Sequence, residues 1–198
     1  MKQAKVKPTP YAQTYRVEGF NNEALIWMDF CKGSQNAFKT IYQKYFNLLF
    51  NYCLKFTADR SLIQDCIQDL FITIHKNHSN LGPTNSIKNY LFISIRRKLL
   101  RYLQKENKFI YKDKVHWECL LYDVPIEYEL VEEQEKKQNL ARLKYLLEKL
   151  PRRQKQALYY YYYENFSYQE VAEIMEMTNI KSARNLIYKG ISSLREGF

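Results

Sequence analysis

The first half of the chain has the apolar spacing of three amphipathic helices. In the first, steps of three and four residues separate Ala37, Phe38, Ile41, Tyr42, Tyr45, Phe46, Leu49 and Tyr52. After a break at residues 57–61, the spacing returns at Leu62, Ile63, Cys66, Ile67, Leu70, Phe71 and Ile74. Gly82 and Pro83 end this helix, and residues 86–106 form a third with a buried side at Ile87, Leu91, Ile95, Leu99 and Leu103. Three such helices predict one compact domain.

Helical spacing returns near the C-terminus. An apolar stripe at Leu143, Leu146, Leu147 and Leu150 stops at Pro151. Proline suits the first residue of a helix, where its missing N–H costs nothing, so the next helix is predicted from Pro151 to about Tyr163. Its tyrosine run is expected to add to the core, with hydroxyls that reach solvent, at Tyr159, Tyr162 and Tyr163.

A helix-turn-helix is predicted at the end of the chain. Ser167 and Glu170 have capping-box spacing and start a short helix that ends at Met175. The last helix covers residues 181–194 and packs through Ala183, Ile187, Gly190 and Leu194. Its polar side carries Lys181, Arg184, Asn185, Tyr188 and Lys189. Such a helix enters the major groove, where Arg and Asn read guanine and adenine edges and Lys meets phosphates. The alternative is an antiparallel helix pair with a solvated cationic face.

The residues between the two sets of helices have the opposite charge. Residues 109–139 hold eight acidic side chains against four lysines, show no sustained helical period and include Pro125. With only 5 Gly and 5 Pro, the chain has too few turn-forming residues for an all-β fold. The prediction is all-α, with two small helical domains joined by a linker. Its parts are a tail at 1–20, a domain at 21–107, an acidic linker at 108–138 and a domain at 139–198.

The charge balance favours a polyanionic partner. The chain has 31 Lys+Arg and 21 Asp+Glu, a net charge of +10, which suits nucleic acid or an anionic membrane surface. The excess is local: residues 88–108 hold seven basic side chains and one acid. No apolar stretch approaches the ~20 residues that span a bilayer, and the cysteines are too scattered for a disulfide framework. We therefore expect a cytoplasmic protein with a polyanionic partner, and the charge alone leaves both nucleic acid and a membrane surface open.

Two further surfaces are predicted on the first domain. The third helix presents cations at four-residue steps with others alongside, at Arg96, Arg97, Lys98, Arg101 and Lys105. Aromatic residues lie among them at Tyr90, Phe92 and Tyr102, and this combination suits a single strand of DNA. The second helix exposes acid and amide groups beside an apolar side chain, at Asp65, Gln68, Asp69 and Ile72, which suits a protein partner. The alternatives are a solvated basic face and a surface ion-pair face.

Three segments in sequence order resemble a known family. They are ADRSLIQDCIQDLFITIHKN, SIKNYLFISIRRKLLRYLQKEN, and LLEKLPRRQKQALYYYYYENFSYQEVAEI followed by KSARNLIYKGISSLRE. They resemble bacterial sigma factors of the extracytoplasmic-function (ECF) group, which keeps only a promoter-melting domain and a helix-turn-helix domain. The resemblance covers residues 21–107 and 139–198.

The resemblance implies a role for each surface. The face around Asp65, Gln68 and Asp69 matches the motif that binds core RNA polymerase. The helix with Arg96, Arg97, Arg101 and Lys105 matches the segment that holds the separated strand of the minus-ten element. The helix that begins at Lys181 matches the recognition helix for the minus-thirty-five element. An anti-sigma factor, often membrane-bound, is a further implied partner, and no catalysis, cofactor or small-molecule substrate is implied.

Some positions depart from the family pattern. His75 stands where Trp is usual, and Arg97 and Arg101 stand where Asn and Asp are common. The break in the helix-turn-helix is one residue longer than usual and has Glu176 where Gly is expected.

Two other classes of protein compete with this interpretation. A helix-turn-helix regulator that does not bind core polymerase would leave the Asp65–Ile72 face unused. An enzyme is disfavoured because no glycine-rich phosphate loop or nucleophile motif occurs. A metal site at His75, His78 and Cys66 lacks further ligands at plausible spacing, so no metal is expected.

Overall fold

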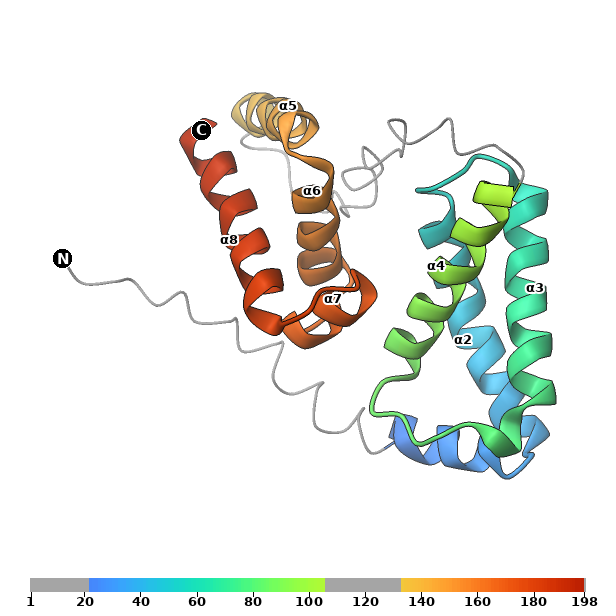
Figure 1. Ribbon diagram of the computed structural model, residues 1–198. Helices are drawn as coiled ribbons and strands as arrows, with labels where there is room; N and C mark the ends of the chain where they lie inside the picture. The colour runs from blue at the N-terminus through green and yellow to red at the C-terminus, as the bar shows by residue number, and fades with distance from the viewer. Residues whose placement is uncertain (1–21, 106–132, 198) are drawn as a thin grey trace. The chain divides into compact units, whose positions relative to one another are not determined.

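The computed structural model describes residues 22–105 and 133–197. Every regular element in these ranges is a helix, which confirms the predicted all-α class. The helices form two compact units, one with α2, α3 and α4 and the other with α5 to α8 (Figure 1). The predicted tail at 1–20 and most of the predicted linker at 108–138 lie outside the described residues.

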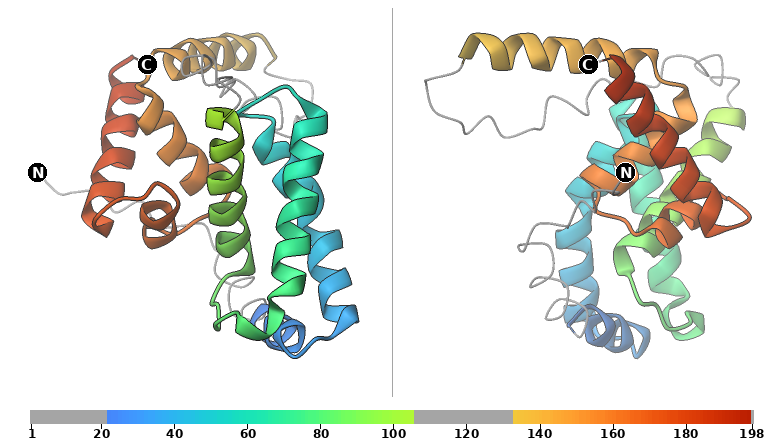
Figure 2. Two further views of the ribbon diagram at one scale, coloured as in Figure 1. Left: turned by 45° about the vertical axis from the view of Figure 1, so that its right-hand side comes forward. Right: turned by 90° about the vertical axis from the view of Figure 1, so that its left-hand side faces the viewer.

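The first unit is a bundle with a short helix across one end. Its long helices are α2 (Gln35–Cys53), α3 (Arg60–Lys76) and α4 (Ile87–Lys105), which run alongside one another (Figure 2). Residues 22–31 form the short helix, and a 3₁₀ turn at His78–Asn80 follows α3. Asp59 caps α3 by accepting a hydrogen bond from the Leu62 N–H at 3.0 Å.

The core of this unit contains the apolar residues that the spacing predicts. All the predicted core positions of α3 and α4 are buried. On α2, Phe38, Tyr42 and Phe46 are half-buried and the other predicted residues are buried. Trp27 joins this core from the helix at 22–31, and its indole N–H donates to the Gly82 carbonyl at 2.9 Å. Ten residues give too few repeats for the apolar spacing to single out that helix.

The second unit packs three helices against the last one. Its elements are α5 (Glu133–Lys149), α6 (Arg152–Leu158), a π-helical turn (Tyr159–Tyr163), α7 (Tyr168–Ile174) and α8 (Ile180–Gly197). α8 contacts α5, α6 and α7. Gly190 permits the close approach of α8 to α6, because a Cβ there would lie 3.0 Å from Cδ1 of Leu158.

Two helix boundaries differ from those predicted. α5 begins at Glu133, whereas the apolar stripe predicts a start near Leu140. The added segment, EQEKKQN, has no apolar residue to show a period, but it is rich in Glu, Gln and Lys, which favour helix. Pro151 occupies the N-cap position of α6 instead of its first helical residue.

The tyrosine run follows a different geometry from the one predicted. The Glu164 N–H donates to the carbonyl of Tyr159, five residues back, at 3.1 Å, as in a π-helix. The wider turn buries Tyr160 with Tyr159 and leaves Tyr162 58% exposed and Tyr163 39% exposed. Tyr163 still contributes to the core through its ring, which stacks on Tyr159 with ring centres 5.2 Å apart. The prediction that Tyr162 contributes to the core was wrong, because it assumed 3.6 residues per turn.

The helix-turn-helix begins and packs as predicted. The hydroxyl of Ser167 accepts a hydrogen bond from the Glu170 N–H at 3.2 Å, and the Glu170 carboxylate accepts from the Ser167 N–H at 2.8 Å. This reciprocal pair is a capping box. Of the predicted packing residues, Val171, Ala172, Met175, Ala183, Ile187 and Gly190 are buried and Leu194 is half-buried.

The turn between α7 and α8 contains a strained residue. Glu176 has φ +53°, in the left-handed region where a side chain costs about 1–2 kcal/mol and Gly costs nothing. We expect Glu176→Gly to stabilise α7 and α8 by about 0.5–1 kcal/mol, because relief of strain outweighs the added freedom of the unfolded chain. Hydrogen exchange of the full chain, read from peptides that cover both helices, measures this gain.

The control for this prediction is Glu173→Gly. Glu173 is also exposed but lies inside α7, where a glycine costs about 1 kcal/mol. Equal destabilisation by both substitutions would contradict the prediction.

Candidate nucleic-acid and protein interfaces

The polar side of α8 lies on the surface. Lys181, Arg184, Asn185, Tyr188 and Lys189 are all exposed, as predicted. The start of the helix is fixed by Asn179, whose Oδ1 accepts hydrogen bonds from the Ser182 N–H at 2.8 Å and the Ser182 hydroxyl at 3.0 Å. A capped helix start holds the cationic side chains of its first turns in a defined direction.

Arg184 has an aromatic neighbour on α7. Its guanidinium lies 5.3 Å from the ring centre of Tyr168, within cation–π distance. The Tyr168 ring in turn stacks on Tyr161, with ring centres 4.6 Å apart and planes 16° apart. Burial and the hydrogen bond with Tyr161 raise the pKa of Tyr168, so its hydroxyl stays neutral. The stack therefore restrains the arginine that the sequence assigns to base recognition.

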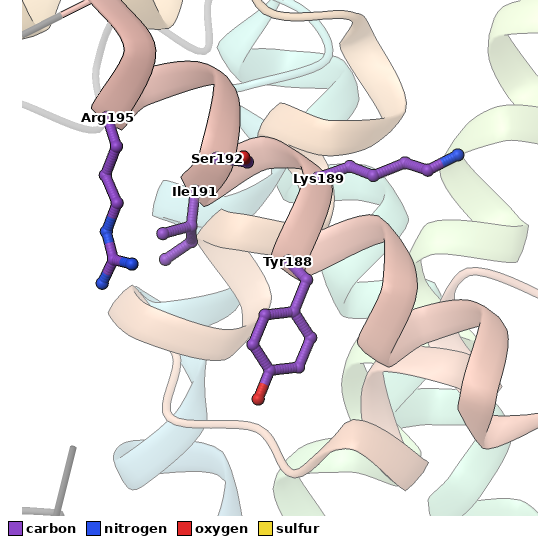
Figure 3. Close-up of a pocket in the computed structure, with 5 residues that line it drawn as sticks. All are labelled: Tyr188, Lys189, Ile191, Ser192 and Arg195. Carbon is purple, nitrogen blue, oxygen red and sulfur yellow. The ribbon is translucent and has the colours of Figure 1, made fainter. Parts of the chain in front are cut away.

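The C-terminal half of α8 borders a pocket of about 320 Å³. It is lined by Tyr188, Lys189, Ile191, Ser192 and Arg195. Figure 3 shows Tyr188 and Arg195 extending from the helix toward the same side as Ile191, whereas Lys189 points away from them. Since Tyr188 also belongs to the predicted recognition face, the pocket continues that face along the helix.

The basic side of α4 is less uniform than the sequence predicts. Arg97, Arg101 and Lys105 are exposed, whereas Arg96 and Lys98 are half-buried. Of the five cations, only these three lie fully on the surface.

Two of the three aromatic residues named on α4 do not lie among its exposed cations. Phe92 is fully buried against Tyr52, with ring centres 4.8 Å apart, and Tyr90 packs on Trp27 at 5.0 Å. The idea that Tyr90 and Phe92 stack on DNA bases was therefore wrong. Both lie on the side of α4 that packs against the bundle.

The predicted protein-binding face of α3 is on the surface, and one of its residues, Asp69, contacts side chains of α4. Asp65, Gln68 and Ile72 are exposed, and Ile72 is 51% exposed. Asp69 is different: its Oδ2 accepts a hydrogen bond from the Tyr102 hydroxyl at 2.9 Å and lies 3.4 Å from the Lys98 Nζ. The sequence pattern does not reveal this contact, because Tyr102 is 33 residues away on another helix.

The three residues considered for a metal site have other surroundings. Cys66 is fully buried in the core, and His75 packs edge-on against Phe38 with ring centres 4.7 Å apart. The ring Nδ1 of His78 donates to the Cys31 carbonyl at 3.0 Å. Within the two described ranges, no three His, Cys, Asp or Glu side chains come together in a way that would hold a metal ion.

Membrane spans are also absent from the part of the chain that is described. None of its helices combines the length and apolar character needed to cross a bilayer.

Comparison with protein families gives two matches, in the order that the fold suggests. Residues 41–109 match Sigma-70 region 2, and residues 140–194 match Sigma-70, region 4. Region 2 thus covers α3 and α4, and region 4 covers the helix-turn-helix. Together the two matches span more than half of the chain, and it belongs to the sigma-70 family. Its pairing of regions 2 and 4 is the organisation of the ECF group, which confirms the resemblance.

Solved structures with the same fold include two complexes. CnrH, in complex with the cytosolic domain of CnrY, is 16% identical, with a TM-score of 0.56 over 88% of this chain and 95% of that chain. The sigma factor RpoE from Bartonella quintana, in complex with the anti-sigma factor NepR, is 17% identical, with a TM-score of 0.52 over 81% of this chain and 95% of that chain. At such identities the likeness shows the fold alone. A search of curated protein sequences gave no significant match.

Proposed function

We propose that this sigma factor binds core RNA polymerase through α3 and contacts promoter DNA through α4 and α8. The observation that carries the proposal is that one chain combines a region 2 match and a region 4 match, each with exposed cations on a helix. A helix-turn-helix regulator that acts without polymerase would not need the exposed face of Asp65, Gln68, Asp69 and Ile72.

The recognition of the minus-thirty-five element is assigned to the polar side of α8. Arg184 and Asn185 have the donors and acceptors that pair with guanine and adenine edges in the major groove. Lys181, Tyr188 and Lys189 flank them and suit phosphate oxygens. The restraint of Arg184 by Tyr168 reduces the entropy that the arginine loses on binding.

The capture of the melted minus-ten strand is assigned to Arg97, Arg101 and Lys105 on α4, with Arg96 beside them. Extruding a base from the duplex costs a few kcal/mol, and an arginine that stacks on a captured base returns about 0.5–2 kcal/mol. Cations that follow the backbone of the separated strand favour the open state over the closed duplex. In this function the chain supplies binding energy and no covalent chemistry, and it acts in the cytoplasm, where polymerase and chromosome meet.

An anti-sigma factor is the expected regulator. The related fold of RpoE is known in complex with the anti-sigma factor NepR. We infer that a comparable partner covers the polymerase-binding or DNA-binding faces of this chain and is released on a signal.

The experiment that tests the function is size-exclusion chromatography of the full chain with core polymerase, followed by in vitro transcription on a genomic promoter library. We expect co-elution and new promoter-specific transcripts. Gln68→Ala, on the α3 face, should weaken co-elution, whereas Gln43→Ala, an exposed glutamine on α2, should not. DNA binding without co-elution would favour the regulator that acts alone.

A further inference from the structure

One carboxylate on α3 is held by two side chains of α4. The Tyr102 hydroxyl donates to Asp69 Oδ2 at 2.9 Å, and the Lys98 Nζ lies 3.4 Å from the same oxygen. Both contacts use one oxygen, and the Asp69 side chain remains 46% exposed. The Tyr102 hydrogen bond and the charge of Lys98 lower the pKa of Asp69, so this surface carboxylate stays ionised.

We propose that Lys98 and Tyr102 are positioning residues for the contact of Asp69 with core polymerase, and that Lys98 is not a DNA-binding cation. The inference rests on the proposed function, because it requires the α3 face to bind polymerase. On this proposal Lys98 supports the polymerase-binding face of α3 and does not contact DNA. Tyr102 supports the same face.

Geometry separates Lys98 from the three exposed cations of α4. The Lys98 side chain is only 27% exposed and points to Asp69, whereas Arg97, Arg101 and Lys105 are exposed. Lys98 and Tyr102 are four residues apart on one ridge of the helix, and both reach the same carboxylate. The negative charge of Asp69 cancels much of the attraction of Lys98 for a phosphate.

Restraint of Asp69 has a consequence for partner binding. A side chain that is already fixed loses less rotamer freedom when a partner binds, a saving that corresponds to about a 2- to 10-fold gain in affinity. The Asp69 side chain remains 46% exposed, so a partner that binds the face of Asp65, Gln68 and Ile72 can reach the restrained carboxylate. The two residues of α4 thus act through Asp69 and need not touch the polymerase.

The same unit offers a matched control. The Glu23 Oε1 accepts hydrogen bonds from the Lys44 Nζ and from the Tyr45 hydroxyl, each at 2.6 Å. This is also a carboxylate held by one lysine and one tyrosine, but it joins the helix at 22–31 to α2 and includes no residue of α3 or α4. If removing a carboxylate–lysine–tyrosine cluster only destabilises the bundle, variants of the Glu23 cluster and of the Asp69 cluster should have the same effect.

The test measures the affinity of full-length variants for core polymerase by competition, and their capture of a single-stranded minus-ten oligonucleotide as holoenzyme. We expect Tyr102→Phe and Lys98→Met each to weaken polymerase binding about 2- to 10-fold and to leave strand capture within about twofold. Lys98→Arg, which keeps a cationic donor, should restore most of the affinity. Tyr45→Phe and Lys44→Met should leave polymerase affinity unchanged.

A double-mutant cycle separates positioning from general stability. In an Asp69→Ala background, Tyr102→Phe should cause no further loss of polymerase affinity, whereas a merely structural role would add to the loss. If Asp69→Ala weakens polymerase binding but neither Tyr102→Phe nor Lys98→Met does, the positioning role is wrong and the proposed function stands. If Asp69→Ala itself has no effect, the polymerase contact of Asp69 fails together with this inference. Loss of strand capture by Lys98→Met at unchanged polymerase affinity would return Lys98 to the DNA surface.

Discussion

Replacing Arg184 with Ala is expected to remove most of the preference of the holoenzyme for its minus-thirty-five element. A bidentate arginine–guanine contact is worth about 1–3 kcal/mol, so the variant should lose about 5- to 150-fold in affinity for its own promoter. The loss should be confined to the cognate sequence, because a contact with a base edge forms only where that base is present. Arg184 is exposed on α8 beside the Tyr168 ring, where it can make such a contact. Equilibrium binding to cognate and scrambled promoters at fixed salt measures the difference.

Two variants on the same helix serve as controls. Lys189→Ala removes an exposed cation suited to phosphate, so it should lower the affinity for both promoters equally. The slope of log affinity against log salt concentration should fall by about one. Ser193→Ala, at another exposed position of α8, should change neither. If Arg184→Ala weakens cognate and scrambled DNA alike, then Arg184 contacts the backbone and the assignment of base recognition to it is wrong.

The helical cores could be predicted because apolar spacing directly encodes which face of a helix is buried. Ile63, Ile67, Leu91 and Ile95 follow the period, and all four are fully buried. The capping box at Ser167 was also visible, since its two partners are three residues apart. Contacts within one or two helical turns are local in sequence, and a pattern can report them.

Contacts between helices carry no comparable signal. The hydrogen bond from Tyr102 to Asp69 joins residues 33 apart, and nothing in the sequence distinguishes Lys98 from its neighbouring cations. The packing of Phe92 in the core was missed for the same reason: an aromatic residue beside cations suits either a bundle core or a nucleic acid. The π-helical turn at Tyr159–Tyr163 changes the periodicity itself, so extrapolation at 3.6 residues per turn misplaced Tyr162.

The sequence therefore predicts only part of the candidate site. Exposure of Arg184 and Asn185 follows from the periodicity of α8, which buries Ala183 and Ile187 on the opposite side. The different exposure of the α4 cations depends on how the helices pack, and the contact of Lys98 with Asp69 of α3 is visible only in the three-dimensional arrangement. The two arginines that remain on the surface, Arg97 and Arg101, are the residues on which strand capture should depend most strongly.

Combined replacement of Arg97 and Arg101 with Ala is expected to abolish stable promoter opening while polymerase binding persists. The two residues are one helical turn apart and exposed, so they can follow adjacent positions of one strand. If each arginine stacks on one captured base, worth about 0.5–2 kcal/mol, their joint loss should lower the population of open complexes at least about fivefold. Permanganate reactivity of unpaired thymines in the promoter measures that population.

The control for this double variant removes two charges elsewhere in the same unit. Lys32 lies just before α2 and Lys39 lies within it, and both are exposed. Replacing both with Ala removes the same two positive charges as the Arg97/Arg101 variant but leaves α4 unchanged. Open complexes should persist in the control, and both variants should co-elute with core polymerase. Binding of the Arg97/Arg101 variant to single-stranded DNA should also depend less on salt, by about 0.7 in the logarithmic slope for each phosphate that the variant no longer neutralises. Unchanged permanganate reactivity would mean that strand capture uses other residues, and the assignment of Arg97 and Arg101 to the melted strand would be wrong.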